Sequence, residues 1–244
     1  MRGRHYERVA AEYSKALFYS EGPLKSWQVG VLAKALGPVG CGRFADVGGG
    51  DGAFGMALAG ALGDDVEVTL VEPSAAMVAS NTREKPSLTL NVDGASWAAS
   101  SDDGRYDRVL MKEVVHHLED RPRLFRAIRE NKLKEGGAIV IATRPKFDID
   151  YPFFEAAKRV WQRNQPDTFE AELREAGFTR VTHQVDAYPL EVSLSVWIDM
   201  IRGRFWSTFD EFDDDEIERG IQELHTTYDS PLRFEERLLT FVAS

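Results

Sequence analysis

The amino-acid sequence predicts an α/β fold built on a doubly wound, mostly parallel sheet. Residues 44–52 form a short apolar strand ending in Asp46 and then a glycine-rich loop, and a helical pattern begins at once over 53–62. Such a succession of strand, loop and helix is a nucleotide-binding corner. Beyond it, apolar strands alternate with amphipathic helices, which implies parallel strands joined by right-handed crossovers.

Two helices are expected ahead of this corner, over residues 6–18 and 24–36. The segment 21–23, Glu-Gly-Pro, separates them, because glycine and proline both interrupt a helix. Gly37-Pro38 ends the second helix before the first strand begins.

The elements after the glycine loop follow from the apolar periodicity of the sequence. Short apolar runs predict the strands, and apolar residues at helical spacing predict the helices. Gly136-Gly137 allows the chain to reverse into the last of these strands. Strands are expected at 66–71, 88–92, 106–111 and 138–142, and helices at 74–80 and 121–133.

The second half of the chain is rich in aromatic residues. Asp167 and Glu170 give a helix-start signal, and Gly177 gives a stop signal. We interpret the additions as one helical cap over the strand ends. Helices are expected at 151–165, 167–176 and 190–209, an acidic helix start at 210–218, and strands at 179–187 and 234–242.

Composition and charge exclude several classes of protein. The chain has 244 residues and a formal net charge of -10, which disfavours nucleic acid as a partner. Its single cysteine, Cys41, excludes an intrachain disulfide and a thiolate metal cluster. No apolar run has the length of a membrane span, and the N-terminus lacks the apolar stretch of a signal peptide. We therefore expect a cytoplasmic protein, a monomer or homodimer, without a membrane partner.

The glycines alone leave the type of nucleotide open. Gly48, Gly50 and Gly52 let the backbone turn sharply and approach a ligand closely, since a Cβ would obstruct it. Gly50, Gly52 and Gly55 also fit the dinucleotide pattern G-x-G-x-x-G. Asp46 distinguishes between a dinucleotide and a cationic ligand, because a carboxylate just before the loop would repel a pyrophosphate and attract an ammonium or sulfonium group.

Residues 46–52, Asp-Val-Gly-Gly-Gly-Asp-Gly, resemble the first motif of the class I S-adenosylmethionine-dependent methyltransferases. The resemblance covers about residues 40–143 and includes the turn at Gly136-Gly137, although Glu135 stands where the family usually has proline. It implies a Rossmann-like, seven-stranded sheet with an antiparallel C-terminal hairpin, S-adenosylmethionine as methyl donor and S-adenosylhomocysteine as product. We divide the single methyltransferase domain into a helical cap (1–39), a donor-binding core (40–143) and a sheet completion with an inserted substrate cap (144–244).

Donor-binding residues follow from their positions and from the resemblance. Glu72 ends the second strand, where an acid accepts hydrogen bonds from both ribose hydroxyls. Asp93, with Gly94 beside it, corresponds to the family's acid that meets the adenine amino group. Glu113 lies at the exit of the fourth strand, where methyl donor and acceptor should meet. The expected donor site comprises these four residues together with Asp46, Gly48, Gly50 and Gly52.

Two adjacent histidines follow the fourth strand, in a stretch over 107–118 that resembles the family's fourth motif. His116 is our preferred general base, because a histidine titrates near neutrality, and His117 is its packing neighbour, with little to separate them. The alternative is that the pair only shapes the pocket. No second cluster of ligands supports a metal site, so we expect no metal.

Methyl transfer needs mainly orientation, because the sulfonium is already activated and the displacement is in line. Aromatic residues of a closing cap would supply it, and their faces could attract the sulfonium, although aromatic residues at helical spacing usually form core. Arginines near the acceptor could clamp a carboxylate or be solvated surface charges. The candidates are Tyr13, Tyr19, Trp197 and Trp206 among the aromatic residues, and Arg144 and Arg202 among the arginines.

The sequence thus predicts methyl transfer to a small-molecule acceptor. Three alternatives stay open: methylation of a protein, an S-adenosylmethionine-binding protein without catalysis, and an NAD-dependent oxidoreductase built on the overlapping glycine pattern. Asp46 and Asp93 speak against the oxidoreductase. The acceptor atom is open as well, since oxygen, nitrogen, sulfur and carbon are all methylated on this scaffold.

Overall fold

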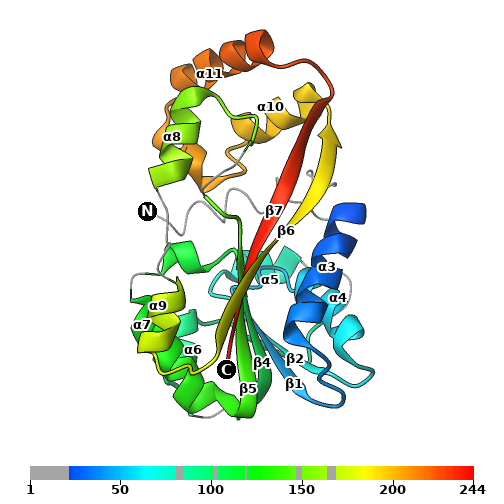
Figure 1. Cartoon of the computed structure of the whole chain (residues 1–244), viewed down its shortest axis with the longest axis vertical. Coiled ribbons are helices and arrows are strands. Elements are labelled where there is room, and N and C mark those ends of the chain that lie inside the picture. Colours follow the sequence, from blue (N-terminus) through cyan, green and yellow to red (C-terminus); the bar gives the residue numbers. More distant parts are fainter. Residues whose placement is uncertain (1–21, 81–84, 102–103, 119, 147–149, 164–168) are drawn as a thin grey trace. The chain divides into compact units, whose positions relative to one another are not determined.

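A computed structural model gives the fold of the chain (Figure 1). It describes residues 22–80, 85–101, 104–118, 120–146, 150–163 and 169–244. The helix expected at 6–18 lies outside these ranges, as do the candidate residues Tyr13 and Tyr19. The chain divides into two compact units. Among the described residues, the sheet unit comprises those of 26–144, 169–185 and 238–244, and the helical unit comprises those of 22–25, 145–163 and 186–237.

Seven strands form one sheet in the order β3-β2-β1-β4-β5-β7-β6. The first five strands pair in parallel, and β7 pairs with β5 in the antiparallel direction. This arrangement confirms the predicted doubly wound, mostly parallel sheet with antiparallel C-terminal strands. The strands are β1 (Arg43–Val47), β2 (Glu67–Val71), β3 (Leu88–Leu90), β4 (Tyr106–Lys112), β5 (Leu133–Thr143), β6 (Val181–Val192) and β7 (Leu232–Ala243).

Helices cover both faces of the sheet (Figure 1). Because side chains alternate along a strand, Leu110 of β4 joins the core under α3 and α4, whereas its neighbour Val109 joins the core under α6, α7 and α9. All of these core residues are almost fully buried. The helices here are α3 (Pro23–Leu36), α4 (Ala53–Leu62), α5 (Ala75–Ser80), α6 (Gly94–Ala99), α7 (Arg121–Ala127) and α9 (Phe169–Glu175).

The sheet unit departs from the sequence expectation at two places. The helix α6 was not predicted; Asp93 caps it by accepting hydrogen bonds from the backbone N–H groups of Ala95 and Ser96. The helix expected over 121–133 ends in a π-helical turn, η2 (Ile128–Lys132), and β5 begins at once. Gly136, with φ +72°, lies in a bulge of β5 rather than in a turn ahead of it.

The helical unit is built around aromatic side chains. The helix expected over 190–209 is broken at Gly203 and Arg204, where Arg204 has a left-handed φ of +51°. The helix expected at 151–165 begins only at Glu155. The elements of this unit are α8 (Glu155–Arg163), α10 (Leu194–Arg202), η3 (Ser207–Glu211) and α11 (Asp214–Thr227). None of the helices that the structure describes is both long and apolar enough for a membrane span.

The acidic start of α11 contains a capping box. Asp213 accepts a hydrogen bond from the N–H of Glu216, and the Glu216 side chain accepts one from the N–H of Asp213. Asp213→Ala is expected to lower the free energy of unfolding by about 1 kcal/mol, because the N-terminal N–H groups lose this acceptor. Urea denaturation measures the loss. Asp215→Ala, in the same helical turn, is the control, and an equal loss in both variants would contradict the prediction.

Candidate functional site

The glycine loop joins β1 to α4 and depends on left-handed backbone. Gly48, Gly50 and Gly52 have φ values of +72°, +62° and +78°. The Gly48 N–H donates to the carbonyl of Val71 at 2.7 Å, which ties the loop to β2. A Cβ at Gly48 would lie 2.6 Å from Cγ2 of Val114, in the chain that leaves β4. The ends of β1 and β4 therefore touch at the point where the strand order reverses.

Glu72 holds the loop from the end of β2. Its two carboxylate oxygens accept hydrogen bonds from the N–H groups of Gly50 at 3.0 Å and Ser74 at 2.9 Å. Burial raises the pKa of Glu72, while these two hydrogen bonds act in the opposite direction. A carboxylate oxygen accepts more than one hydrogen bond, so Glu72 retains the capacity to bind ribose hydroxyls.

Asp46 lies beneath the loop and is only 2% exposed. A Cβ at Gly49 would lie 2.4 Å from its Oδ2, and a Cβ at Gly55 would lie 2.5 Å from the same atom, so only glycine leaves room for this carboxyl group. Among the described residues, Oδ2 has no hydrogen-bond partner. Burial raises the pKa of Asp46 to about 7, with Lys112 opposing the shift and Glu72 and Asp51 adding to it.

This raised pKa predicts how stability changes with pH. The folded protein retains the Asp46 proton up to about pH 7, whereas the unfolded chain releases it near 3.8. The Asp46 contribution is therefore fully present at low pH and is lost as the pH rises through this interval, by roughly 4 kcal/mol. Asp46→Asn removes the titration, so the variant should gain stability relative to wild type between about pH 5 and about pH 8, as measured by urea denaturation.

Asp93→Asn is the matched control. The hydroxyl of Ser96, and then its backbone N–H, lower the pKa of Asp93, so this group stays ionised across the same interval. The stability difference between wild type and Asp93→Asn should thus be independent of pH there. A pH-independent difference for Asp46→Asn would contradict the assignment of Asp46 as a buried, protonated acid.

The predicted adenine site coincides with the start of α6. Asp93 is exposed, and its carboxylate accepts three hydrogen bonds, from Ala95 N–H, Ser96 N–H and the Ser96 hydroxyl. A Cβ at Gly94 would lie 3.0 Å from Cγ1 of Val47, which brings Gly94 close to the end of β1. Asp is a favoured N-cap residue, and this signal could have revealed the helix from the sequence.

The exit of β4 carries the remaining candidate residues. Glu113 has a left-handed φ of +56°, and its side chain forms an ion pair with Arg144, with Oε2 and Nη1 3.3 Å apart. The 3-10 turn η1 (Val115–His117) follows, and the His116 and His117 rings lie 4.0 Å apart between centroids. The structure thus gathers Glu113, Arg144 and both histidines at one strand exit.

Three predicted acceptor-binding residues belong to the helical unit, and they lie in its core or at its surface. Trp197 is 0% exposed, and its Nε1–H donates to the carbonyl of Pro152 at 2.7 Å. Trp206 is buried against it, with ring centroids 4.7 Å apart. Arg202 forms two hydrogen bonds with Glu218 at the surface, at 2.7 and 3.0 Å. In this structure the two tryptophans form core, and Arg202 is engaged in a surface ion pair.

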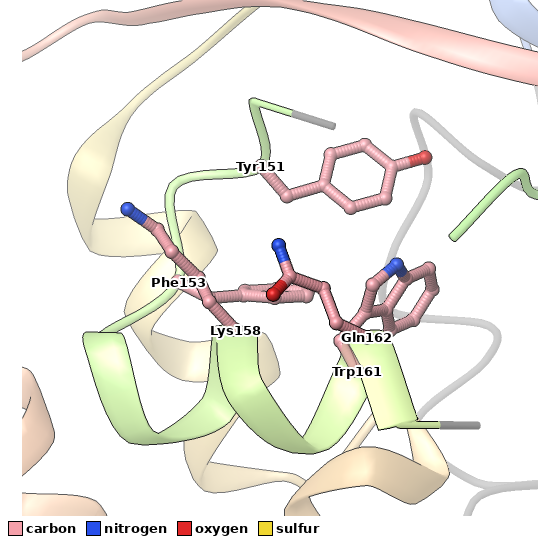
Figure 2. Close-up of a pocket in the computed structure, with 5 residues that line it drawn as sticks. All are labelled: Tyr151, Phe153, Lys158, Trp161 and Gln162. Carbon is pink, nitrogen blue, oxygen red and sulfur yellow. The ribbon is translucent and has the colours of Figure 1, made fainter. Parts of the chain in front are cut away.

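The helical unit also contains a small pocket, shown in Figure 2. The rings of Tyr151, Phe153 and Trp161 meet at centroid distances of 5.5 to 5.7 Å, with Lys158 and Gln162 completing the lining. Its volume of about 10 Å³ has room for one water molecule. This pocket is therefore too small for a methyl acceptor.

A larger cavity of about 270 Å³ lies in the sheet unit beside the glycine loop. Sequence reasoning did not identify it, because residues from three separate elements line it and no local motif marks them. Its lining consists of Asp51, Leu70, Val78, Ala79, Lys85, Pro86 and Thr89. No group of three or more His, Cys, Asp or Glu side chains suited to a metal ion occurs in the described ranges of the chain.

Together these features define a nucleotide-binding α/β protein. Left-handed glycines leave a cradle of bare backbone after β1, an acid ends β2, and the strand order reverses between β1 and β4. The cradle of bare backbone fits a nucleoside donor, whereas Asp46 is buried beneath the loop with a raised pKa and is not the exposed carboxylate for a cationic ligand group that was expected from the sequence. Gly48, Gly50 and Gly52 would hold this donor, with Glu72 at its ribose.

Comparison with known proteins identifies the class. Residues 45–139 match the family model of the methyltransferase domain. A comparison with curated protein sequences gave no match. Residues 45–139 therefore carry a methyltransferase domain, and a protein of the same fold is crystallised with S-adenosylmethionine or S-adenosylhomocysteine.

Solved structures share the fold at low sequence identity. An Anabaena variabilis protein described as a methyltransferase from an antibiotic biosynthesis pathway has a TM-score of 0.67 and 17% identity, over 90% of this chain and 97% of its own. An Archaeoglobus fulgidus S-adenosylmethionine-dependent methyltransferase has a TM-score of 0.58 and 15% identity, over 96% and 99%. Phosphoethanolamine N-methyltransferase 2 of Haemonchus contortus, in complex with phosphomonomethylethanolamine and S-adenosylhomocysteine, has a TM-score of 0.57 and 17% identity, over 91% and 53%.

Proposed function

We propose that this protein transfers a methyl group from S-adenosylmethionine to a small-molecule acceptor at the carboxyl ends of β1 and β4. One observation carries the proposal: Val114, which packs at Gly48 of the glycine loop, is followed within the same turn by His116 and His117. The residues that would hold the donor and those that would meet the acceptor are therefore joined by one short segment.

The roles of the residues follow from this arrangement. When bound, S-adenosylmethionine supplies a methyl group that is already activated by its positively charged sulfur. The loop glycines approach the donor with bare backbone, Glu72 accepts from its ribose hydroxyls, and Asp93 and Gly94 lie at its adenine. His116 removes a proton from the acceptor, and His117 packs against it. Orientation of the acceptor supplies most of the acceleration.

A small acceptor is favoured over a macromolecule. The net charge of -10 disfavours nucleic acid, and we expect the protein to act in the cytoplasm. Two proteins of similar fold carry names that point to small molecules, an antibiotic pathway in one case and phosphomonomethylethanolamine in the other.

Two measurements test the proposal. Calorimetric titration should show binding of S-adenosylmethionine and S-adenosylhomocysteine, and none of NAD. Incubation with isotopically labelled donor and pooled metabolites, followed by mass spectrometry, should then place the label on a small molecule. Label found only on added proteins would contradict the small-molecule acceptor and leave the donor assignment intact.

His116→Ala is expected to lower turnover of the identified acceptor by roughly 100-fold, because general-base catalysis typically contributes that much or more. Affinity for S-adenosylhomocysteine should remain nearly the same, since the base meets the acceptor. His117→Ala is the control, with a smaller loss expected. If His116→Ala turns over as fast as wild type, His116 is not a general base, and orientation of the acceptor accounts for the acceleration of methyl transfer.

A further inference from the structure

Two residues that the sequence assigned to different ligands are joined in the structure. Glu113 follows β4, and Arg144 follows β5, the strand that pairs with β4. Their side chains form an ion pair at 3.3 Å and are only 22% and 10% exposed, respectively. Removing one partner of such a pair takes away a charge that compensates the other in a partly buried place, which is costly.

Glu113 also has a backbone conformation that residues with a side chain rarely adopt. Its φ of +56° is left-handed, which costs about 1–3 kcal/mol in a residue other than glycine. Its N–H donates to the carbonyl of Ala142 at 2.8 Å. The backbone and the side chain of Glu113 are therefore both held by the end of β5, and these contacts offset the strain.

The bend at Glu113 decides where the next residues lie. Val114 follows directly and packs at Gly48, and Val115 is fully buried in the core of the sheet unit. The turn then presents His116 and His117. A change in the bend would therefore move Val114, which packs at the glycine loop, together with the two histidines.

We propose that Arg144 is a positioning residue for methyl transfer, which holds Glu113 in its left-handed bend and thereby sets Val114 against the glycine loop. Arg144 acts through Glu113 and not by contact with the acceptor. The relevance to methyl transfer rests on the proposed function, whereas the geometry is independent of the acceptor. Glycine adopts a left-handed φ without strain, so a glycine at position 113 should make the clamp unnecessary.

Calorimetric affinity for S-adenosylhomocysteine tests this clamp without an acceptor. Arg144→Met is expected to weaken binding by about tenfold or more. Addition of Glu113→Gly should restore the affinity to within about threefold of wild type, because the bend is then free of strain and the carboxylate is removed together with the guanidinium that it pairs with. Arg121→Met is the matched control: it breaks the partly buried Arg121–Glu172 pair of the same unit, with atoms 2.6 Å apart, and should leave the affinity unchanged.

A double variant that binds as weakly as Arg144→Met would overturn the proposal. If circular dichroism shows that Arg144→Met does not fold, the variants Glu113→Gln and Glu113→Gly test the proposal instead. The Glu113→Gln protein keeps the backbone strain but lacks the ion pair, so it should bind S-adenosylhomocysteine more weakly than the Glu113→Gly protein. Equal affinities would overturn the clamp and favour direct contact between the Glu113 carboxylate and the donor. Wild-type protein that does not bind S-adenosylhomocysteine would contradict the proposed function itself, so the two failures are distinguishable.

Discussion

Gly48→Ala is expected to weaken the binding of S-adenosylmethionine severely. A Cβ at this position would lie 2.6 Å from Cγ2 of Val114 and 2.9 Å from its Cβ, so rotation of the valine side chain cannot relieve the clash. The left-handed φ of +72° adds about 1–2 kcal/mol of strain. The loop or the exit of β4 must shift, and we expect an affinity loss of roughly 100-fold or more, about 2.7 kcal/mol, by calorimetry.

Gly60→Ala provides the control for this variant. Gly60 lies in α4, the helix that follows the loop, and a Cβ there would meet nothing within 4 Å. Alanine in the interior of a helix should stabilise the protein by roughly 0.5–1 kcal/mol and leave donor affinity unchanged. Gly50→Ala should cause a loss of donor affinity between those of Gly48→Ala and Gly60→Ala, since a Cβ at Gly50 would meet only the flexible end of Met77 at 3.0 Å. Donor binding by Gly48→Ala within threefold of wild type would contradict the loop as donor site.

Trp197→Ala is expected to destabilise the helical unit by about 3–5 kcal/mol. The indole is fully buried, and its centroid lies 4.7 Å from that of Trp206 and 4.9 Å from that of Phe234. Alanine would leave a cavity among these rings and remove the hydrogen bond to the carbonyl of Pro152. Urea denaturation followed by circular dichroism measures the change in the free energy of unfolding.

Val196→Ala is the matched control for Trp197→Ala. Val196 is the neighbouring residue of α10 and is 41% exposed, so its truncation should change stability by less than about 0.5 kcal/mol. A Trp197→Ala protein with wild-type stability but reduced turnover would contradict the core role and support the acceptor-binding role predicted from the sequence.

Local patterns predicted much of the sheet unit. The helix over 53–62 has the bounds expected, because Gly52 and Gly63 flank an uninterrupted apolar pattern. The single helix expected over 190–209 was wrong, since the run of aromatic residues continues past the break at Gly203 and Arg204. Gly136 was expected in a turn, but the pairing of β5 with β4 draws it into a bulged strand.

The features of the candidate site also fall into those that the sequence indicated and those that only the structure showed. The glycine loop, the acid after β2 and the histidines after β4 were proposed from the sequence because each is one short segment whose chemistry is local, and their roles stay predictions. The ion pair between Glu113 and Arg144 was not, since the pairing of β4 with β5 brings together residues that are 31 positions apart in the sequence. Its detection required knowledge of the strand order.

The sequence by itself determined the fold class, because periodicity and glycine spacing act within a few residues of each other. Only the tertiary structure decided the environment of each side chain: that Asp46 lies beneath the loop, that Trp197 forms core, and that Arg144 is paired. The physical reason is that burial and ion pairing depend on which strands and helices become neighbours, and distant parts of the chain settle this jointly.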